Sequence, residues 1–166
     1  LAGQRQYSKL VADAGYGVIW GAPCIRPRVG VRVRQGGVAI LYKRPLEARL
    51  VPPRTKEQQS FFDAGRLVHA AIPFKGDCLH VICAYGYTNA GSCKGQRDRN
   101  EALFTEVCSL VVEQGNAPTV LAGDLNTPLE KSAILQSNCV QGVIVDMAKM
   151  DATSRGLEQT EATCFA

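Results

Sequence analysis

Two apolar runs joined by a short polar connection constrain the fold of this chain more than any other feature. The runs cover residues 66–74 and 78–85, and Lys75-Gly76-Asp77 separates them. Apolar runs of this length bounded by turn residues are typical of strands, and a short connection that contains Gly joins neighbouring antiparallel strands. Residues 66–85 are therefore predicted to form a β-hairpin.

Further strands and helices are expected on both sides of this hairpin. Apolar runs and alternation predict strands at 16–20, 38–42, 119–122, 142–146 and 160–165, and a short strand at 47–51 that pairs beside 38–42. Helical spacing of apolar residues predicts helices at 4–14, 98–114, 128–136 and 147–153, with Asp98 as the cap of the second. Residues 21–35, with two prolines and four arginines, are expected to form a loop.

This order of elements predicts an α/β protein without the regular βαβ alternation of a doubly wound sheet. Hairpins beside helices favour mixed or antiparallel sheets packed together, with helices outside. A chain of 166 residues, 46% hydrophobic and 20% charged, fits one soluble globular domain, 1–166. No apolar stretch approaches the roughly 20 residues that cross a bilayer, so we expect no membrane partner.

Charge is distributed unevenly along the chain. Residues 1–75 carry 13 basic and 4 acidic residues, a formal charge of +9, whereas residues 76–166 carry 6 and 11, a charge of −5. A basic half suits a polyanionic partner such as nucleic acid. The densest basic cluster contains Arg26, Arg28, Arg32 and Arg34, and a solvated loop is the alternative interpretation of it.

The cysteines and histidines disfavour a zinc site. The seven cysteines form no C-x-x-C pair, and the chain has two histidines, His69 and His80. An odd number of scattered cysteines with apolar neighbours favours buried, reduced thiols in an intracellular protein, a setting compatible with the nucleus.

The segment 117–126 ends an apolar strand abruptly in Gly123-Asp124-Leu125-Asn126. Asp124 and Asn126 are two residues apart, so they share one side if the backbone stays extended. A carboxylate beside a carboxamide can orient a water and hold a phosphate oxygen or a hydrated cation. The alternative is an Asx-type turn, which Gly, Asp and Asn all favour, and spacing leaves both interpretations open.

Three segments in this order resemble the endonuclease/exonuclease/phosphatase superfamily. They are residues 36–41 (GGVAIL), 79–85 (LHVICAY, leading into a polar loop) and 117–126 (APTVLAGDLN), with weaker likeness at 15–16, 145–146 and 163–165. The superfamily includes deoxyribonuclease I, the apurinic/apyrimidinic endonucleases and the endonuclease domains of LINE-type retroelements, to which this chain is most similar in character.

The resemblance implies a four-layer α/β/β/α sandwich of two packed mixed, largely antiparallel sheets, and cleavage of a phosphodiester by metal-assisted, in-line attack of water. Mg²⁺ is the implied ion, with Mn²⁺ as the alternative, and its ligands are not assigned. Asp124 matches the residue that positions or deprotonates the water, Asn126 the residue that contacts the phosphate, and Tyr85 the phenol that donates toward it. Tyr85 as a half-buried strand end and Asn126 as a turn residue are the structural alternatives.

Several other polar residues are weaker candidates. Asn89 could stand for the superfamily's loop Asn, although its loop lacks the Pro and is one residue longer. Asn100 is equally interpreted as a helix-start residue. His69 and His80 are expected to be structural, and Arg66 to be a surface residue.

Two superfamily elements are missing: an early Gln-Glu on a strand and a closing Ser-Asp-His. Both would fall beyond the ends of this chain, which predicts a fragment that is itself inactive. The expected parent is a metal-dependent phosphodiester hydrolase, a DNA-nicking endonuclease of retroelement type, and a reverse transcriptase encoded downstream would settle the retroelement assignment. The alternatives are a catalytically dead remnant or nucleic-acid-binding module of the same fold, and a phosphatase or deadenylase of the superfamily.

Overall fold

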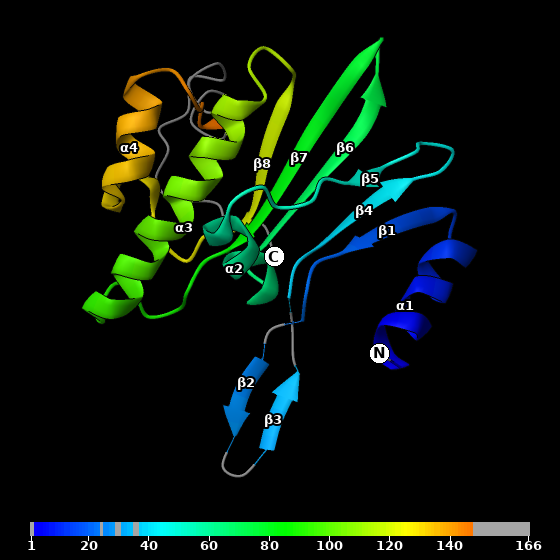
Figure 1. The fold of residues 1–166 in the computed structure, drawn as a ribbon, viewed down its shortest axis with the longest axis horizontal. Coiled ribbons are helices and arrows are strands. Elements are labelled where there is room, and N and C mark those ends of the chain that lie inside the picture. The colour runs from blue at the N-terminus through cyan, green and yellow to red at the C-terminus, as the bar shows by residue number, and fades with distance from the viewer. Residues whose placement is uncertain (1, 24, 29–30, 35–36, 148–166) are drawn as a thin grey trace, which may run out of the picture. The chain divides into compact units, whose positions relative to one another are not determined.

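The structure is a computed structural model that describes residues 2–23, 25–28, 31–34 and 37–147 (Figure 1). The described part is α/β, as the sequence predicts. Its helices are α1 (Ala2–Asp13), α2 (Lys56–Asp63), α3 (Lys94–Glu113), α4 (Ala133–Val140) and the 3-10 helix η1 (Leu129–Lys131). Its strands are β1 (Tyr16–Trp20), β2 (Ile25–Arg28), β3 (Val31–Arg34), β4 (Ala39–Lys43), β5 (Arg49–Leu50), β6 (Leu67–Phe74), β7 (Asp77–Tyr85) and β8 (Thr119–Asp124).

The chain divides into two compact units. The first unit comprises residues 1–85 and 116–122, and the second comprises 86–115 and 123–166. The first unit holds most of the strands, together with α1 and α2, and the second holds α3, η1 and α4.

The hairpin predicted over residues 66–85 is confirmed. β6 and β7 pair antiparallel from Leu67 opposite Ala84 to Phe74 opposite Asp77. The two connecting residues have positive φ, 48° at Lys75 and 86° at Gly76. Such a turn matches the right-handed twist of the flanking strands, and Gly adopts it without a steric penalty.

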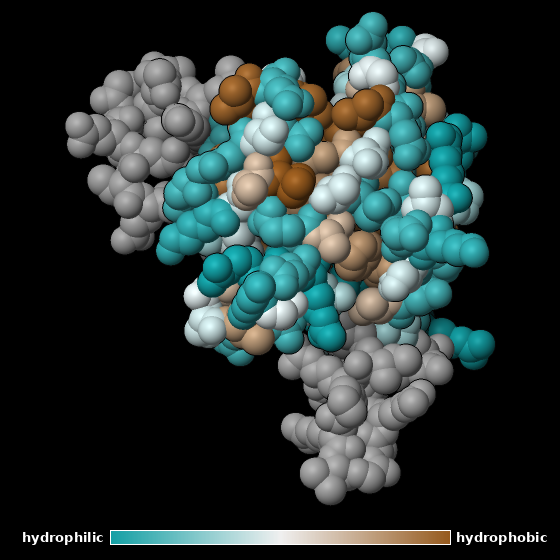
Figure 2. Space-filling view, turned by 60° about the vertical axis from the view of Figure 1, so that its left-hand side comes forward, coloured by the Kyte–Doolittle hydropathy of each residue, from teal (hydrophilic) through white to brown (hydrophobic). Residues whose placement is uncertain are grey.

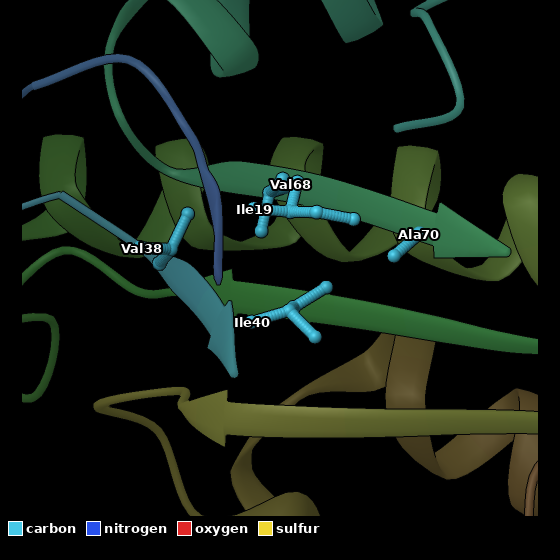
Figure 3. Packing of buried hydrophobic residues seen from close by; sticks show 5 residues of the cluster. All are labelled: Ile19, Val38, Ile40, Val68 and Ala70. Carbon is cyan, nitrogen blue, oxygen red and sulfur yellow. The ribbon is translucent and has the colours of Figure 1, made fainter. Parts of the chain in front are cut away.

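β1 and β4 form a second antiparallel pair that packs on β6. Ile19 is on β1, Ile40 is on β4, and Val38 immediately precedes β4. These three side chains form one buried cluster with Val68 and Ala70 of β6 (Figure 3). Partly buried apolar side chains surround this cluster: Tyr42, Ala48, Phe62, Val81, Cys83 and Tyr85. Because alternate residues of a strand face opposite sides, one face of β6 and β7 supplies this core.

The four-stranded sheet, of order β5-β6-β7-β8, is mixed. In the first unit, the His80 amide donates to the Pro118 carbonyl at 2.8 Å. In the second unit, the Gly86 amide donates to the Asp124 carbonyl at 2.8 Å. The donor and the acceptor advance together along the chain, so β8 runs parallel to β7, whereas β5, β6 and β7 pair antiparallel.

The second unit buries one face of α3 against α4. Leu103, Phe104 and Val107 of α3 are fully buried, and so is Leu135 of α4. Ser132 caps α4, since its hydroxyl accepts from the Leu135 amide at 3.1 Å. Glu101 of α3 also caps this helix, accepting from the Ile134 amide at 3.1 Å. The apolar stripe predicted for the helix at 98–114 therefore exists on α3, and it is buried.

Several predicted elements were wrong. Residues 21–35 are not a loop throughout, because β2 and β3 form an antiparallel ribbon there. The alternation of Arg with Ile, Val or Pro is the period-two pattern of strands, and it outweighs the loop-like composition. β5 pairs with β6 rather than with β4. Residues 142–146 are turn, bend and irregular backbone, since the amides of Val143 and Ile144 donate to the Asn138 carbonyl at the end of α4.

The helix boundaries also differ from those predicted. α3 begins at Lys94, so Asp98 does not cap it, and Cys93 occupies the cap position. The helix predicted at 128–136 is divided by Ser132 into η1 and α4. α2 was missed because its eight residues are mostly polar, although the Thr55 hydroxyl caps it at the Gln58 amide. Residues 148–153 and 160–165 lie outside the described residues.

The surface drawn in Figure 2 is mostly hydrophilic, with hydrophobic residues in scattered groups. Large apolar side chains are exposed singly at several positions, among them Tyr7, Leu41 and Val140. Scattered apolar residues of this kind are normal on protein surfaces. The described helices include none with the length and apolar composition to span a membrane.

Candidate functional site

Asp124 and Asn126 are brought together by a turn at the end of β8. The strand ends at Asp124, and Asn126 has a φ of 50°, in the left-handed region. The Asn126 amide donates to Asp124 Oδ1 at 3.1 Å. A side-chain oxygen that accepts from the amide two residues ahead defines an Asx-type turn. The backbone is thus not extended at Asn126, and of the two arrangements that the spacing left open the structure has the Asx-type turn.

The Asn126 side chain ties this turn to the loop that follows β7. Its Nδ2 donates to the Gly86 carbonyl at 3.1 Å, and the Gly86 amide donates to the Asp124 carbonyl at 2.8 Å. A Cβ placed on Gly86 would collide with the Leu125 carbonyl. Glycine at position 86 thus allows the two loop backbones to approach closely enough for both hydrogen bonds.

The Asp124 carboxylate remains open to solvent in this arrangement. Asp124 is exposed, and Asn126 is half-buried. A carboxylate offers about four lone-pair sites, of which the Asn126 amide takes one. The turn therefore fixes the Asp124 side chain while leaving oxygen acceptors that can orient a water molecule.

Asn100 of α3, a weaker candidate in the sequence, bonds to residues of both loops. It is 0% exposed, and its Oδ1 accepts from the Tyr87 amide at 2.6 Å. Its Nδ2 donates to the Tyr87 carbonyl at 3.1 Å and to Thr127 Oγ1 at 2.8 Å. Its interpretation as a helix-start residue was wrong, because α3 begins at Lys94. The sequence signal that could have identified Asn100 is its position as a polar residue on the apolar stripe of α3.

Tyr85 is the last residue of β7 and belongs to the first unit. Its ring packs against the core cluster around Val68 and Ala70, and the Arg66 guanidinium lies 4.5 Å from the ring centroid. The Tyr85 amide donates to the Arg66 carbonyl at 2.9 Å, and Arg66 Nη1 donates to the Tyr85 carbonyl at 3.3 Å. Tyr85 therefore has a structural environment of its own, with a cation–π contact to its ring.

His69 and His80 form a hydrogen-bonded pair on the β6–β7 hairpin. His69 Nε2 lies 2.9 Å from His80 Nδ1, and the ring centroids are 5.1 Å apart. Burial lowers the pKa of His69 to about 4, with smaller contributions from His80 and Arg54. Burial also lowers the pKa of His80. The geometry fits two neutral rings, one donating and one accepting, and therefore the structural interpretation.

Asn89 takes part in a turn ahead of α3. Its φ is 64°, and its carbonyl accepts from the Ser92 and Cys93 amides at 3.2 and 2.9 Å. These bonds give Asn89 a local structural role at the start of the helix.

The described residues do not fit a complete metal site. In the part of the chain that the structure describes, no group of three or more His, Cys, Asp and Glu side chains could hold an ion. Disulfides do not involve the described cysteines Cys78, Cys83, Cys93, Cys108 and Cys139. Burial raises the pKa of the Cys83 and Cys108 thiols, which disfavours the reactive thiolate form.

Comparison with known proteins leaves the family open. No family model matches this chain, and no curated protein sequence matches it. A solved structure that resembles it is titled "Crystal structure of beta toxin 275-280 from Staphylococcus aureus". The two are 19% identical with a TM-score of 0.45, over 76% of this chain and 50% of the other. The chain thus spans half the length of that protein, and the superfamily resemblance stays a prediction.

Proposed function

We propose that this chain belongs to a phosphodiester hydrolase that nicks DNA, built as a four-layer α/β/β/α sandwich. One observation carries the proposal. The exposed Asp124 carboxylate stands at the end of β8 in a turn fixed by three hydrogen bonds, which join Asp124, Asn126 and Gly86. A carboxylate held in this way at a strand end is suited to act on a water molecule.

The chemistry required of the site is modest. A phosphodiester anion repels nucleophiles, so the attacking water must be oriented and must lose a proton. Asp124 performs both tasks in this proposal. One hydrogen of Asn126 Nδ2 is used by the Gly86 carbonyl, and the second hydrogen of this amide donates to a phosphate oxygen. The superfamily resemblance adds the Tyr85 phenol as a third group, which donates toward the phosphate.

The requirement for Mg²⁺, with Mn²⁺ as the alternative, enters this proposal from the superfamily resemblance. Oxygen ligands and retained waters suit Mg²⁺, and Asp124 is one such oxygen donor. The requirement is tested directly by measuring plasmid nicking with Mg²⁺, with Mn²⁺ and with a chelator present. Nicking that is equal in all three conditions would remove the metal from the proposal.

DNA is the proposed substrate because the first 75 residues carry a formal charge of +9. The densest basic segment is the ribbon of β2 and β3, in which Arg26 pairs with Val33 and Arg32 pairs with Pro27. A two-stranded antiparallel ribbon has the width to enter the major groove of B-form DNA. Contacts from arginines to phosphates would make the affinity fall with salt.

The deciding experiment is Asp124→Asn in the full-length parent protein that contains this chain, tested in a plasmid-nicking assay with Mg²⁺. The variant keeps the size of the side chain and an oxygen that accepts from the Asn126 amide, so folding should be nearly unchanged. Removing the carboxylate should reduce the nicking rate at least ~10²-fold, the scale of general-base assistance.

Asp77→Asn is the matched control for this substitution. Asp77 is another exposed aspartate whose Oδ1 accepts a backbone amide, from Cys78 at 2.8 Å. We expect this variant to nick at the wild-type rate. Equal nicking by wild type and Asp124→Asn would remove Asp124 from the mechanism.

The second candidate is a nucleic-acid-binding module that keeps the fold without catalysis. The observation that favours it is that Asp124 and Asn126 both make hydrogen bonds that a turn uses, so neither residue needs a catalytic role. This candidate predicts salt-dependent binding of duplex DNA with no nicking by the full-length parent protein. Nicking that Asp124→Asn abolishes would exclude it.

A further inference from the structure

We propose that Asn100 is a positioning residue that holds Asp124 and Asn126 in their working arrangement. The inference rests on the function proposed above. Asn100 is on α3, and its side chain bonds to Tyr87 and Thr127 rather than to Asp124 or Asn126. It acts through the next residue of each loop, because it bonds Tyr87, which follows Gly86, and Thr127, which follows Asn126.

The hydrogen bonds of the two loops form one connected set. Gly86 is bonded to Asp124 and to Asn126, directly between the loops. Asn100 of α3 then joins Tyr87 to Thr127 through three hydrogen bonds from its one side chain. Each loop is therefore held twice, once by its partner loop and once by the helix. Networks of this kind can contribute more than the sum of their separate bonds.

Filling the core does not explain an asparagine at position 100. The residue is 0% exposed and lies on the stripe that also contains Leu103, Phe104 and Val107, where an apolar side chain would be the ordinary choice. A carboxamide there requires partners for one acceptor and for its donors, because an unpaired buried polar group is destabilising. The two loops supply those partners, which indicates that this asparagine is matched to the loops.

The first test measures hydrogen exchange at the Gly86 amide, which Asn100 does not contact. This amide donates to the Asp124 carbonyl, so its exchange rate reports how firmly the two loops are joined. Asn100→Ala should speed its exchange at least ~10-fold. The His80 amide, bonded to Pro118 in the first unit, should exchange at the wild-type rate.

Asn138→Ala is the matched control, because Asn138 is an asparagine of the same unit that bonds within its own helix, to the Ile134 carbonyl at 2.8 Å. It should leave the Gly86 exchange rate unchanged. If Asn100→Ala does not fold, Thr127→Val decides the matter, since it removes one of the three bonds without a large cavity. Wild-type exchange at Gly86 in a folded Asn100→Ala, or in Thr127→Val where Asn100→Ala does not fold, would overturn the inference.

Nicking kinetics of the full-length parent protein supply the readout that a merely structural residue would not change. At a temperature where both proteins are folded, Asn100→Ala should lower kcat for plasmid nicking at least ~10-fold and leave KM unchanged. The exchange measurement does not depend on cleavage, so the two proposals can fail separately. A full-length parent protein that does not nick defeats the proposed function, whereas Gly86 exchange that is unaffected by Asn100→Ala defeats the positioning role.

Discussion

At the scale of single residues, one missing carbon atom at Gly86 decides whether two loops can meet. Its amide and carbonyl bond to Asp124 and Asn126, and the Leu125 carbonyl occupies the place where a Cβ would stand. Backbone atoms cannot move aside as the end of a flexible side chain can. The candidate site therefore depends on the absence of a side chain at Gly86 as much as on its polar groups.

Gly86→Ala should accordingly destabilise the protein. The clash with a backbone carbonyl is an overpacking effect, which typically costs about 1–3 kcal/mol. Gly91→Ala is the control, because Gly91 is in the same unit and a Cβ there has nothing within 4 Å. Urea unfolding of the two variants measures the difference. Equal midpoints would show that Gly86 has room for a methyl group.

The polar residues of the site differ in how well the sequence predicts them. Gly123-Asp124-Leu125-Asn126 marks the end of a strand by its composition, and the structure places Asp124 at that end. The Asx turn was an open alternative, because Gly, Asp and Asn favour turns but do not exclude an extended backbone. The role of Asn100 was not predicted, because its partners, Tyr87 and Thr127, become neighbours through the fold and not through sequence spacing.

At the scale of elements, local patterns predicted the regular pieces and failed where pairing is decided at a distance. The β6–β7 hairpin follows from two apolar runs and a Gly turn, all within 20 residues of each other. The two-residue β5 has too little sequence to specify a partner, and it pairs with β6 across α2. The ribbon of β2 and β3 was obscured by its arginines and proline, although its alternation is strand-like.

The ribbon carries the prediction on DNA binding. Arg26→Gln with Arg32→Gln removes two charges from it, and Lys94→Gln with Lys131→Gln removes two charges from the second unit. Each phosphate contact contributes about 0.9 to the slope of log affinity against log salt concentration. The ribbon variant should therefore lower that slope by nearly 2 and weaken binding, and the control should leave the slope unchanged. Fluorescence anisotropy with a labelled duplex across a salt series measures both. Equal slopes would place the DNA contact elsewhere.

At the scale of the whole molecule, each unit has its own apolar core. In the first unit, β1 and β4 pack against β6 around Val68, and in the second, α3 packs against α4 around Leu103 and Leu135. The sequence predicted the α/β class, because class follows from the order of strands and helices. The division into units depends on contacts between distant segments, such as 116–122 with the first 85 residues, and no local pattern contains that information.

The stability of the whole chain should depend on pH through His69, which is 4% exposed. The pKa of His69 is lowered from 6.5 to about 4 in the folded state, chiefly by burial. Between these values the unfolded chain binds a proton that the folded chain excludes, so stability is full above about pH 6.5 and falls as the pH drops toward 4. At about 1.4 kcal/mol for each pKa unit, the loss is at most about 3 kcal/mol. Asp77, which favours protonated His80, and Arg49 and Arg54, which oppose it, modify the dependence of stability on pH.

Urea midpoints from pH 7 to pH 4 measure the loss of stability, and His69→Gln provides the comparison, because it keeps a hydrogen-bonding side chain that does not titrate. The variant should lose less stability over this range than the wild type, since it retains the background titration of carboxylates. If both proteins lost the same amount, His69 would be excluded as the origin of the acid sensitivity.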